Sequence, residues 1–497
     1  MAIMARIVLL LALALVVFMA TPAASGAIDY AAALSKSLLY FEAQRSGRLP
    51  ATQRVQWRGH SALKDGADHG VDLTGGYYDS GDNVKFGLPM AFTVTMLSWA
   101  VAEQRAGLER AAELGHALDA VRWGADYLVR AHVAGNGGDG EKLFVQVGDG
   151  DSDHKCWERP EDMDTPRGAY EVNATHPGSD VAAETAAALA AASVVFRDAH
   201  AAGGGNYAAT LLTHAKQLFE FAKNHRGLYH NSVPSAKIFY PSGGDQDELL
   251  WAAAWLYIAT GEKNYERFIA DGGNGGVPPL FTWDYKYVGA QTLVAKLVLQ
   301  GKLPDSGNYG ALKSNLEKYL CNIMQHGDGS SGKLSPGGML WVQPWDNQQC
   351  VTAAAFALVA HADHLATAGG SLQCGGVKLP PAQLVSFARS QVDYILGKNP
   401  QKISYMVGYG DRYPEQVHHR GASLPSIKAS PAKIGCSDGS GYFHTAKPNE
   451  NVIVGAIVGG PDANDRYNDS RGNYVQGETS TYTVAPIVGV LARLVHS

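Results

Sequence analysis

Two closely spaced aspartates are the first residues in this chain whose types suggest chemistry. Asp79 and Asp82 lie three residues apart in the segment DLTGGYYDSGDN, residues 72–83. A tight turn through the intervening Ser80 and Gly81 would direct both carboxylates at one point, where they could hold a water molecule and one of them could deprotonate it. The same residue types also form local Asx-type turns that lead into helices, so the spacing alone leaves a purely structural role open.

A glutamate near the C-terminal end is the second candidate. Glu478 ends the segment YNDSRGNYVQGE, residues 467–478, just before an apolar stretch with helical periodicity. Carboxylates are common at helix N-termini because the helix dipole stabilises them, and this would be a structural role. If apolar or acidic neighbours raise its pKa, Glu478 would instead be a general acid.

A histidine pair followed by an arginine is the third candidate. His418, His419 and Arg420 end the aromatic, glycine-rich segment SYMVGYGDRYPEQVHHR, residues 404–420. Such side chains can donate hydrogen bonds to a polyol or an anion. A solvated surface feature and a metal site are the alternatives, and the metal site is disfavoured because adjacent histidines lack the i, i+4 spacing of zinc-binding helices.

An acidic segment begins like a calcium-binding loop but does not continue as one. Asp149, Asp151 and Asp153 have the alternating spacing of an EF-hand, yet His154 stands where the turn glycine belongs and Pro160 where the final glutamate belongs. The pattern therefore excludes an EF-hand and leaves an irregular calcium site open.

Long helices are the elements that we expect to position these segments. Apolar residues recur with helical periodicity in eleven stretches, whereas the alternation typical of strands is weak and confined to short pieces such as residues 452–458. The stretches are residues 31–45, 89–106, 114–128, 180–200, 207–223, 246–260, 286–300, 309–325, 351–365, 382–396 and 481–495. The candidate segments all lie in long loops between them, which predicts an all-α scaffold with its function on the loops.

The composition is that of a large globular protein. The 497 residues are 46% hydrophobic and 18% charged, which is enough apolar material for a large core. A net charge of −6 without any run of Lys and Arg argues against a nucleic-acid partner. No internal repeat or compositional break divides the chain, so we expect one domain over residues 28–497.

Residues 1–27 have the features of a secretory signal peptide. Arg6 provides the positive charge, residues 7–20 are apolar, and small residues follow up to Ala27. The apolar run is shorter than the roughly 20 residues that span a bilayer, which favours cleavage near Gly26 or Ala27 over a membrane anchor. We therefore expect a secreted protein with no membrane association after cleavage.

The cysteines leave several arrangements open. None of them forms a CxxC pair, which excludes a zinc ribbon. Two disulfides with one free thiol and five free cysteines are both consistent with the sequence. The five are Cys156, Cys321, Cys350, Cys374 and Cys436. Asn173 and Asn468 begin N-glycosylation sequons.

Five segments taken together resemble a known family. DLTGGYYDSGDNVKFG (residues 72–87), SYMVGYGDRYPEQVHHR (404–420) and YNDSRGNYVQGE (467–478) resemble the three active-site signatures of glycoside hydrolase family nine. GDGDSDHKCWERPEDM (148–163) and DELLWAAAWLY (247–257) also resemble that family. The likeness is nearest to the secreted plant-type endo-β-1,4-glucanases, or cellulases, and it covers nearly the whole mature chain in the family's order.

The resemblance implies an (α/α)6 toroid of twelve helices, with a cleft built from loops at one end. It also implies hydrolysis with inversion of the anomeric centre. Asp82 would be the general base, Asp79 would help to hold the attacking water, and Glu478 would be the general acid. An inverting pair needs its carboxyl groups roughly 6.5–9.5 Å apart.

Further catalytic residues follow from the same resemblance. His418 and Arg420 match the family's substrate-contacting pair near the −1 sugar, and we group His418 with the catalytic residues. Asp469 matches the signature aspartate, which we also group with the catalytic residues as support for the site.

Aromatic side chains are expected to bind the sugars. The flat CH faces of a glucan stack on aromatic rings, while polar side chains bind its hydroxyl groups. The expected substrate-binding residues are His154, Trp157, Trp251, Trp283, Trp345, Arg420 and Tyr482. Core packing is the alternative for each tryptophan, and it is as well supported as sugar binding for Trp251, which lies near a predicted helix start.

Three positions depart from the family pattern. Ser80 replaces a usual Ala, Thr479 a frequent Pro, and Val484 a common Asn. Val484 would alter either the packing behind Glu478 or a +1-side contact. A glycan at Asn468 would crowd the cleft, so we expect that sequon to be unoccupied.

These features predict a secreted, monomeric endoglucanase of the cell wall or apoplast. It would hydrolyse internal β-1,4 bonds of cellulose or a related β-1,4-glucan, without a cofactor or metal. No carbohydrate-binding module is visible, which favours soluble or amorphous glucans. The alternatives are a non-catalytic β-glucan-binding protein, against which the three carboxylates argue, an inverting hydrolase of another backbone such as xylan, and a metal-dependent hydrolase.

Overall fold

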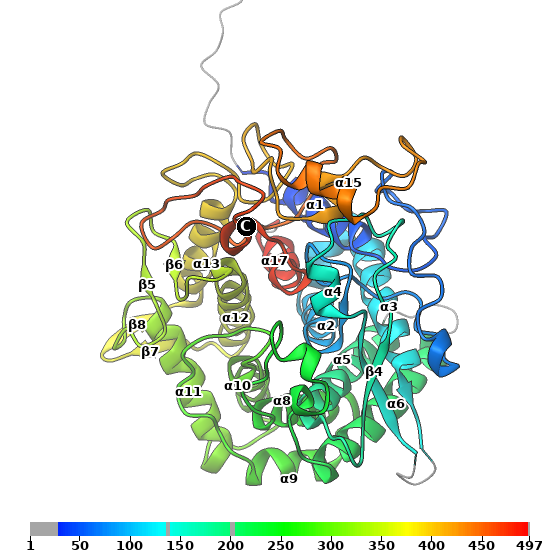
Figure 1. Ribbon diagram of the computed structural model, residues 1–497. Helices are drawn as coiled ribbons and strands as arrows, with labels where there is room; N and C mark the ends of the chain where they lie inside the picture. The colour runs from blue at the N-terminus through cyan, green and yellow to red at the C-terminus, as the bar shows by residue number, and fades with distance from the viewer. Residues whose placement is uncertain (1–27, 136–139, 199–203, 496–497) are drawn as a thin grey trace, which may run out of the picture.

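The computed structural model describes residues 28–135, 140–198 and 204–495 (Figure 1). The predicted signal peptide, residues 1–27, lies outside the described residues.

All eleven predicted helical stretches are helices. The long helices are α1 (Tyr30–Ala43), α2 (Gly87–Arg110), α3 (Leu114–Ala131), α5 (Ser179–Asp198), α6 (Gly204–Asn224), α8 (Gln246–Thr260), α9 (Lys263–Asp271), α10 (Tyr287–Leu299), α11 (Gly307–Ile323), α12 (Asn347–Thr367), α13 (Pro381–Ile395), α15 (Cys436–Phe443) and α17 (Thr481–Leu494). The short ones are α4 (Gly150–His154), α7 (Tyr229–Ser232), α14 (Arg420–Ser423), α16 (Tyr474–Gly477), η1 (Ala67–His69) and η2 (Pro234–Ala236). The sequence missed α9, which is short and mainly polar and buries only Tyr265 and Ile269, and it also missed the short helix α15.

Twelve of the long helices form a double ring (Figure 1). The inner helices are α2, α5, α8, α10, α12 and α17; each packs against the next, and α17 closes the ring on α2. The outer helices are α1, α3, α6, α9, α11 and α13, and each comes directly before one inner helix in the order of the ring. This arrangement confirms the all-α class and the (α/α)6 toroid.

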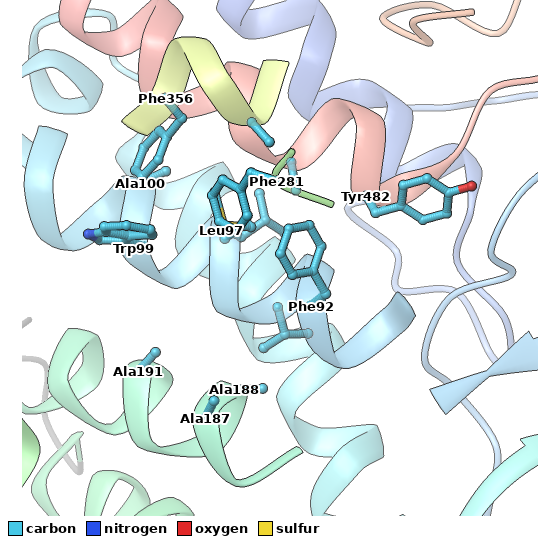
Figure 2. Packing of buried hydrophobic residues seen from close by; sticks show 14 of the residues in the cluster. Phe92, Leu97, Trp99, Ala100, Ala187, Ala188, Ala191, Phe281, Phe356 and Tyr482 are labelled. Atoms are coloured by element: carbon cyan, nitrogen blue, oxygen red, sulfur yellow. The ribbon is translucent and has the colours of Figure 1, made fainter. Parts of the chain in front are cut away.

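The inner helices are buried on nearly every side, as expected for helices that are apolar all round. Both α5 and α12 are long and apolar enough to cross a membrane by composition, but all of the apolar window of α5 and 83% of that of α12 are buried inside the ring. Trp99 of α2 packs edge-to-face on Phe356 of α12, with ring centroids 4.8 Å apart, and small side chains of α5 face the same region (Figure 2). Alanines on α5 thus leave room for the large rings of neighbouring helices.

Trp251 belongs to this core and not to a binding surface. Its side chain is fully buried in α8, and its ring centroid lies 5.3 Å from that of Trp99 and 5.8 Å from that of Trp255. Its indole N–H donates to the carboxylate of Glu184 at 3.3 Å. The prediction that Trp251 binds substrate is therefore wrong, because an inner helix turns this position into the core of the ring.

The loops between the helices form small antiparallel sheets. In the largest, β1 (Lys85–Phe86) and β2 (His132–Val133) pair with the two ends of β3 (Lys142–Val147), and β4 (Ala169–Asn173) pairs along its other edge. Two hairpins are β5 (Lys333–Leu334) with β6 (Leu340–Trp341), and β7 (Leu372–Cys374) with β8 (Val377–Leu379). Residues 452–458 make only isolated bridges rather than a strand.

Two disulfides settle the cysteine arrangement that the sequence left open. Cys156 is bonded to Cys436 at the start of α15, and Cys321 of α11 is bonded to Cys374 of β7. Cys350 is free and buried in α12. The first bridge ties together segments 280 residues apart in the sequence.

Candidate active site

One end of the ring carries a cavity of about 1080 Å³. The segments that precede the inner helices α2, α8, α10, α12 and α17 supply much of its lining, and α15 with the segment after α4 supplies another wall. Nine of the twelve predicted site residues line this cavity: Asp82, His154, Trp157, Trp283, Trp345, His418, Arg420, Glu478 and Tyr482. The ring therefore brings together segments from both ends of the chain.

The loop between Asp79 and Asp82 is pressed against the histidine segment. The chain bends at residues 80–83, and a Cβ atom on Gly81 would lie 2.2 Å from the carbonyl oxygen of His418, so only glycine fits. The Arg420 N–H donates to the Gly81 carbonyl at 3.0 Å, and the Ser80 hydroxyl donates to the Thr479 carbonyl at 3.0 Å. These contacts join the three signature segments directly.

Asp82 is a buried carboxylate that lines the cavity and has a raised pKa. Its Oδ1 accepts a hydrogen bond from the Val84 N–H at 2.8 Å, and its Oδ2 lies 3.9 Å from His154 Nε2. Burial raises the pKa of Asp82 to about 6, while the charges of His154 and Arg420 act in the opposite direction. Asp82 can therefore accept a proton near neutral pH.

Asp79 is buried and does not itself line the cavity. The hydroxyl of Tyr240, a cavity residue, donates to Asp79 Oδ2, and Asp79 Oδ1 has no hydrogen-bond partner among the described residues. Burial, followed by the charges of Asp82 and Glu478, raises the pKa of Asp79 well above its usual range. Asp79 therefore keeps its proton at a pH where Asp82 is ionised, and the pair carries one negative charge.

Glu478 lies opposite a backbone amide of the aspartate loop. Its Oε1 accepts a hydrogen bond from the Gly81 N–H at 3.4 Å, and burial raises its pKa while His154 and Arg420 lower it. The N-cap of α17 is Ser480, whose side chain accepts from the Thr483 N–H. Ser480, and not Glu478, therefore provides the side-chain cap of this helix.

His418 lines the cavity as a neutral ring in a single tautomer. Its Nδ1 lies 2.6 Å from the carbonyl oxygen of Arg471, and since a carbonyl can only accept, Nδ1 carries the proton. Burial lowers the pKa of His418 to about 4, so the ring is neutral in mildly acidic solution. Its Nε2 is then an acceptor.

The neighbouring residues of His418 have different tasks. Arg420 is held by its Nε at 2.8 Å from the Cys156 carbonyl and lies over the ring of Trp157. His419 is buried; one ring nitrogen accepts from the Ala422 N–H at 3.0 Å and the other donates to Gln44 at 2.8 Å. Since the two histidine rings bond different partners, the pair does not converge on one metal position.

Aromatic rings form two sides of the cavity. The indole N–H of Trp157 donates to the Ser423 hydroxyl at 2.8 Å, and its ring meets that of His418 edge-on at 5.0 Å. Trp283 packs edge-on against Tyr240 at 4.9 Å. Aromatic rings that line a cavity beside hydrogen-bonding groups suit a sugar chain.

Three further predicted residues line the cavity. Trp345 is 45% exposed and its ring lies 5.3 Å from that of Tyr474. His154 stacks on Phe239 with ring centroids 4.2 Å apart. Tyr482 lies at the edge of the core packing with its hydroxyl group directed away from it (Figure 2), and it also lines the cavity.

Asp469 positions the backbone instead of lining the cavity. Its carboxylate accepts hydrogen bonds from the N–H groups of Glu415 at 2.8 Å and Gln416 at 3.1 Å. Both lie just before His418 in the chain. The prediction that Asp469 is catalytic is therefore corrected to a positioning role, in line with its expected support of the site.

Several residues of the site escaped sequence reasoning. Tyr240, Phe239, Phe443 and Tyr474 line the cavity, and the only signal for them was the aromatic content of their loops. Asp346 also escaped it: this buried residue accepts from the Thr483 hydroxyl at 2.9 Å, and burial raises its pKa to about 8.

The remaining expectations concern Val484 and the acidic segment. Val484 is fully buried in α17, so its departure from the family pattern affects packing rather than a sugar contact.

In the acidic segment, Asp149 caps α4 by accepting from the Ser152 N–H, and Asp153 accepts from the Asn83 N–H at 3.3 Å. Among the described residues, the one group spaced for a metal ion is Cys156, Glu158 and Cys436, whose two sulfur atoms form a disulfide.

Comparisons with known proteins find close relatives over almost the whole chain. Residues 30–491 match Glycosyl hydrolase family 9. Endoglucanase 14 of Oryza sativa subsp. japonica is 62% identical over 504 aligned residues, which cover 94% of this chain and 96% of that relative. The solved endoglucanase of the termite Nasutitermes takasagoensis has a TM-score of 0.81 and 40% identity, with 95% of this chain and 99% of that chain covered. Cellulase Cel9M of C. cellulolyticum, solved in complex with cellobiose, has a TM-score of 0.80 and 30% identity, with the same coverage.

Proposed function

Since the chain belongs to Glycosyl hydrolase family 9, we propose that it is an endoglucanase that hydrolyses internal β-1,4-glucosidic bonds of a β-glucan with inversion of the anomeric centre. The observation that carries this proposal is the meeting of Asp82 and Glu478 at one aromatic-lined cavity. Burial gives both groups a raised pKa, which suits acid–base chemistry in mildly acidic solution.

Asp82 is the general base and Glu478 the general acid of this proposal. Asp82 takes a proton from a water molecule whose oxygen attacks the anomeric carbon. The bond from that carbon to the glycosidic oxygen breaks, and Glu478 donates its proton to the leaving oxygen. Burial raises the pKa of Glu478 and so favours the protonated form that this step requires. The charges of His154 and Arg420 oppose the effect of burial at both Asp82 and Glu478.

Asp79 orients the attacking water together with Tyr240. The Tyr240 hydroxyl donates to Asp79 and its ring lines the cavity, so Tyr240 connects the buried carboxyl group to the space where water enters. Because Asp79 stays protonated beside ionised Asp82, it does not compete for the water's proton.

A single β-1,4-glucan chain is the proposed substrate. Trp157, Trp283 and Trp345 offer ring faces or edges along the cavity, and His154, Arg420 and Tyr482 add polar atoms beside them. The cellobiose held by Cel9M, a structural relative, supports this substrate class. The proposed enzyme acts without a cofactor and as a monomer.

Secretion to the cell wall or apoplast stays a prediction of the N-terminal sequence. The two disulfides support it, because disulfides persist mainly in oxidising compartments.

The direct test is release of reducing ends from a soluble β-1,4-glucan by the native protein and by Glu478→Gln. The substitution keeps the shape of the side chain and removes its proton, so we expect a loss of about 1000-fold or more in kcat. Glu220→Gln, an exposed change on α6, is the control and retains full activity. NMR of the first product should show the inverted anomer.

Three results would count against the proposal. Unchanged activity of Glu478→Gln at a normal melting temperature would remove the assigned acid. Cleavage of xylan in preference to glucan would identify the protein as a hydrolase of the xylan backbone. Binding of glucan without any cleavage would identify it as a glucan-binding protein.

A further inference from the structure

The guanidinium of Arg471 holds one stretch of backbone. The side chain is buried; its Nη1 donates to the carbonyl oxygens of Tyr442 at 2.7 Å and Thr445 at 2.8 Å, and its Nη2 donates to that of Lys447 at 2.9 Å. Its Nε donates to Asn449 Oδ1 at 2.9 Å. All of these acceptors are uncharged, and all lie within residues 442–449.

This stretch of backbone supports one wall of the cavity. It begins at the C-terminal end of α15, whose residue Phe443 lines the cavity 4.7 Å from the ring of Trp157. Trp157, Leu424 and Ile434, with Tyr442 and Phe443 packed on them, form an apolar cluster separate from the main core. The wall therefore depends on local contacts, and Arg471 provides a large share of its hydrogen bonds.

The main chain of Arg471 contacts the site from the other side. Its carbonyl oxygen accepts from His418 Nδ1 at 2.6 Å, which places the single proton of the neutral ring on Nδ1. His418 lines the cavity, so the unprotonated Nε2 is the nitrogen left for a ligand.

We propose that Arg471 is the positioning residue of this part of the cleft, fixing the α15 wall through its guanidinium and the tautomer of His418 through its carbonyl. It follows that His418 accepts a hydrogen bond from a glucose hydroxyl through Nε2 and donates none. This inference rests on the proposed function for the identity of the ligand, but the tautomer is a property of the free protein.

Lysine cannot replace arginine in this role. The acceptors surround the planar fork from several directions, and an ammonium group on a flexible stem can reach only part of them. Arg471→Lys therefore keeps the charge and loosens the wall. The matched control is Arg159→Lys. Arg159 is also buried, donates to the carbonyl groups of Pro425 and Ala432 at 2.7 Å and pairs with Asp162 at 2.6 Å. Neither of its carbonyl acceptors lines the cavity, whereas Arg471 Nη1 also donates to the carbonyl oxygen of the cavity residue Phe443 at 3.3 Å.

The experiment combines kinetics with nitrogen NMR of histidine-labelled protein. With a soluble cello-oligosaccharide, we expect Arg471→Lys to lower kcat/KM by about 100-fold, mainly through KM, because small misplacements of contact groups have effects of that size. Arg159→Lys should lower the melting temperature comparably and change kcat/KM less than about threefold.

The NMR spectrum tests the tautomer without any substrate. The His418 signal, identified by its absence in His418→Asn, should show a neutral ring protonated at Nδ1 in native protein at pH 6. Arg471→Lys keeps the main-chain carbonyl but loses the side-chain hydrogen bonds that hold it in place, so a mixture of tautomers is expected in this variant. An Nε2-protonated ring in the native protein would overturn the proposal even if Arg471→Lys failed to fold. Equal kinetic losses in the two arginine variants would also overturn it. If the native protein cleaves no glucan, the proposed function fails while the tautomer result still decides the role of Arg471.

Discussion

The carboxyl groups of Asp82 and Glu478 at the cavity and of Asp79 behind it behave differently because their neighbours differ. Asp79 and Asp82 are buried and Glu478 is partly buried, and this desolvation raises the pKa values of all three. Only for Asp82 and Glu478 are the charges of His154 and Arg420, which lower the pKa, among the main causes. Asp79 instead faces the like charges of the other two. The position of each carboxyl group in the fold, rather than its chemical type, therefore determines its pKa.

The pKa of Asp82 leads to a prediction about pH dependence. The proposed base must be ionised, so kcat/KM should fall as the pH drops through about 6, the pKa of Asp82. His154 favours the ionised form of Asp82. His154→Gln should therefore shift the acidic limb of the kcat/KM profile to higher pH, in addition to weakening substrate binding.

The readout is the midpoint of the acidic limb between pH 4 and 8. His69→Gln, which changes a histidine outside the cavity, is the control and should leave the midpoint in place. A midpoint that moves to lower pH in His154→Gln would contradict the assigned interaction.

At the scale of elements, the starts of the inner helices hold the cleft together. Trp345 and Glu478 stand just before α12 and α17, and Trp283 stands just before α10. Because the inner helices pack tightly against one another, the backbone of a residue at the start of such a helix is held in place. The site is therefore only as well ordered as the contacts between inner helices.

Lys286 ties three of these inner helices together at the start of α10. Its ammonium lies 2.8 Å from Glu248 Oε1 of α8 and 3.6 Å from Glu184 Oε2 of α5, and all three side chains are fully buried. Lys286→Met leaves both carboxylates without their cation and should lower the free energy of unfolding by about 3–5 kcal/mol.

Chemical denaturation measures this loss. The double variant Lys286→Met/Glu248→Gln should recover part of the loss, because it removes one of the two carboxylates. Lys223→Met breaks an exposed pair with Glu220 and should change stability by less than about 1 kcal/mol. A double variant no more stable than Lys286→Met would show that the lysine acts through packing instead.

The sequence predicted the parts of this molecule that repeat a pattern. Apart from α9, the inner and outer helices lie in stretches that are long and apolar enough to recognise, and Asp82, His418 and Glu478 lie in motifs, so these helices and residues could be found. Asp346 and Tyr240 lie in loops without a pattern, and only the closed ring brings them to Thr483 and Asp79. Trp251 was misplaced for a similar reason, since only the packing of α8 decides which of its faces is buried.

At the scale of the whole molecule, the buried titratable groups make stability depend on pH in a defined window. Asp346 and Asp180 have pKa values raised to about 8 and about 7, mainly by burial. Each stays protonated in the fold at a pH where it is ionised in the unfolded chain, so its contribution to stability is present at low pH and lost as the pH rises through the folded pKa. Buried His361 and His419 have pKa values lowered to about 3, so their opposing effect ends near pH 6.5, the ordinary histidine value.

Above pH 6.5 the carboxyl groups therefore act alone, and stability should fall between pH 6.5 and 8. Asp346 loses about 1.4 kcal/mol per pH unit in this window. Asp346→Asn removes this dependence while keeping an oxygen that accepts from the Thr483 hydroxyl. The free energy of unfolding, measured at several pH values, should therefore decline less steeply in Asp346→Asn than in the native protein. A slope unchanged by the substitution would mean that Asp346 is ionised in the fold, and Glu478, whose charge raises the pKa of Asp346, would then hold its own proton more tightly.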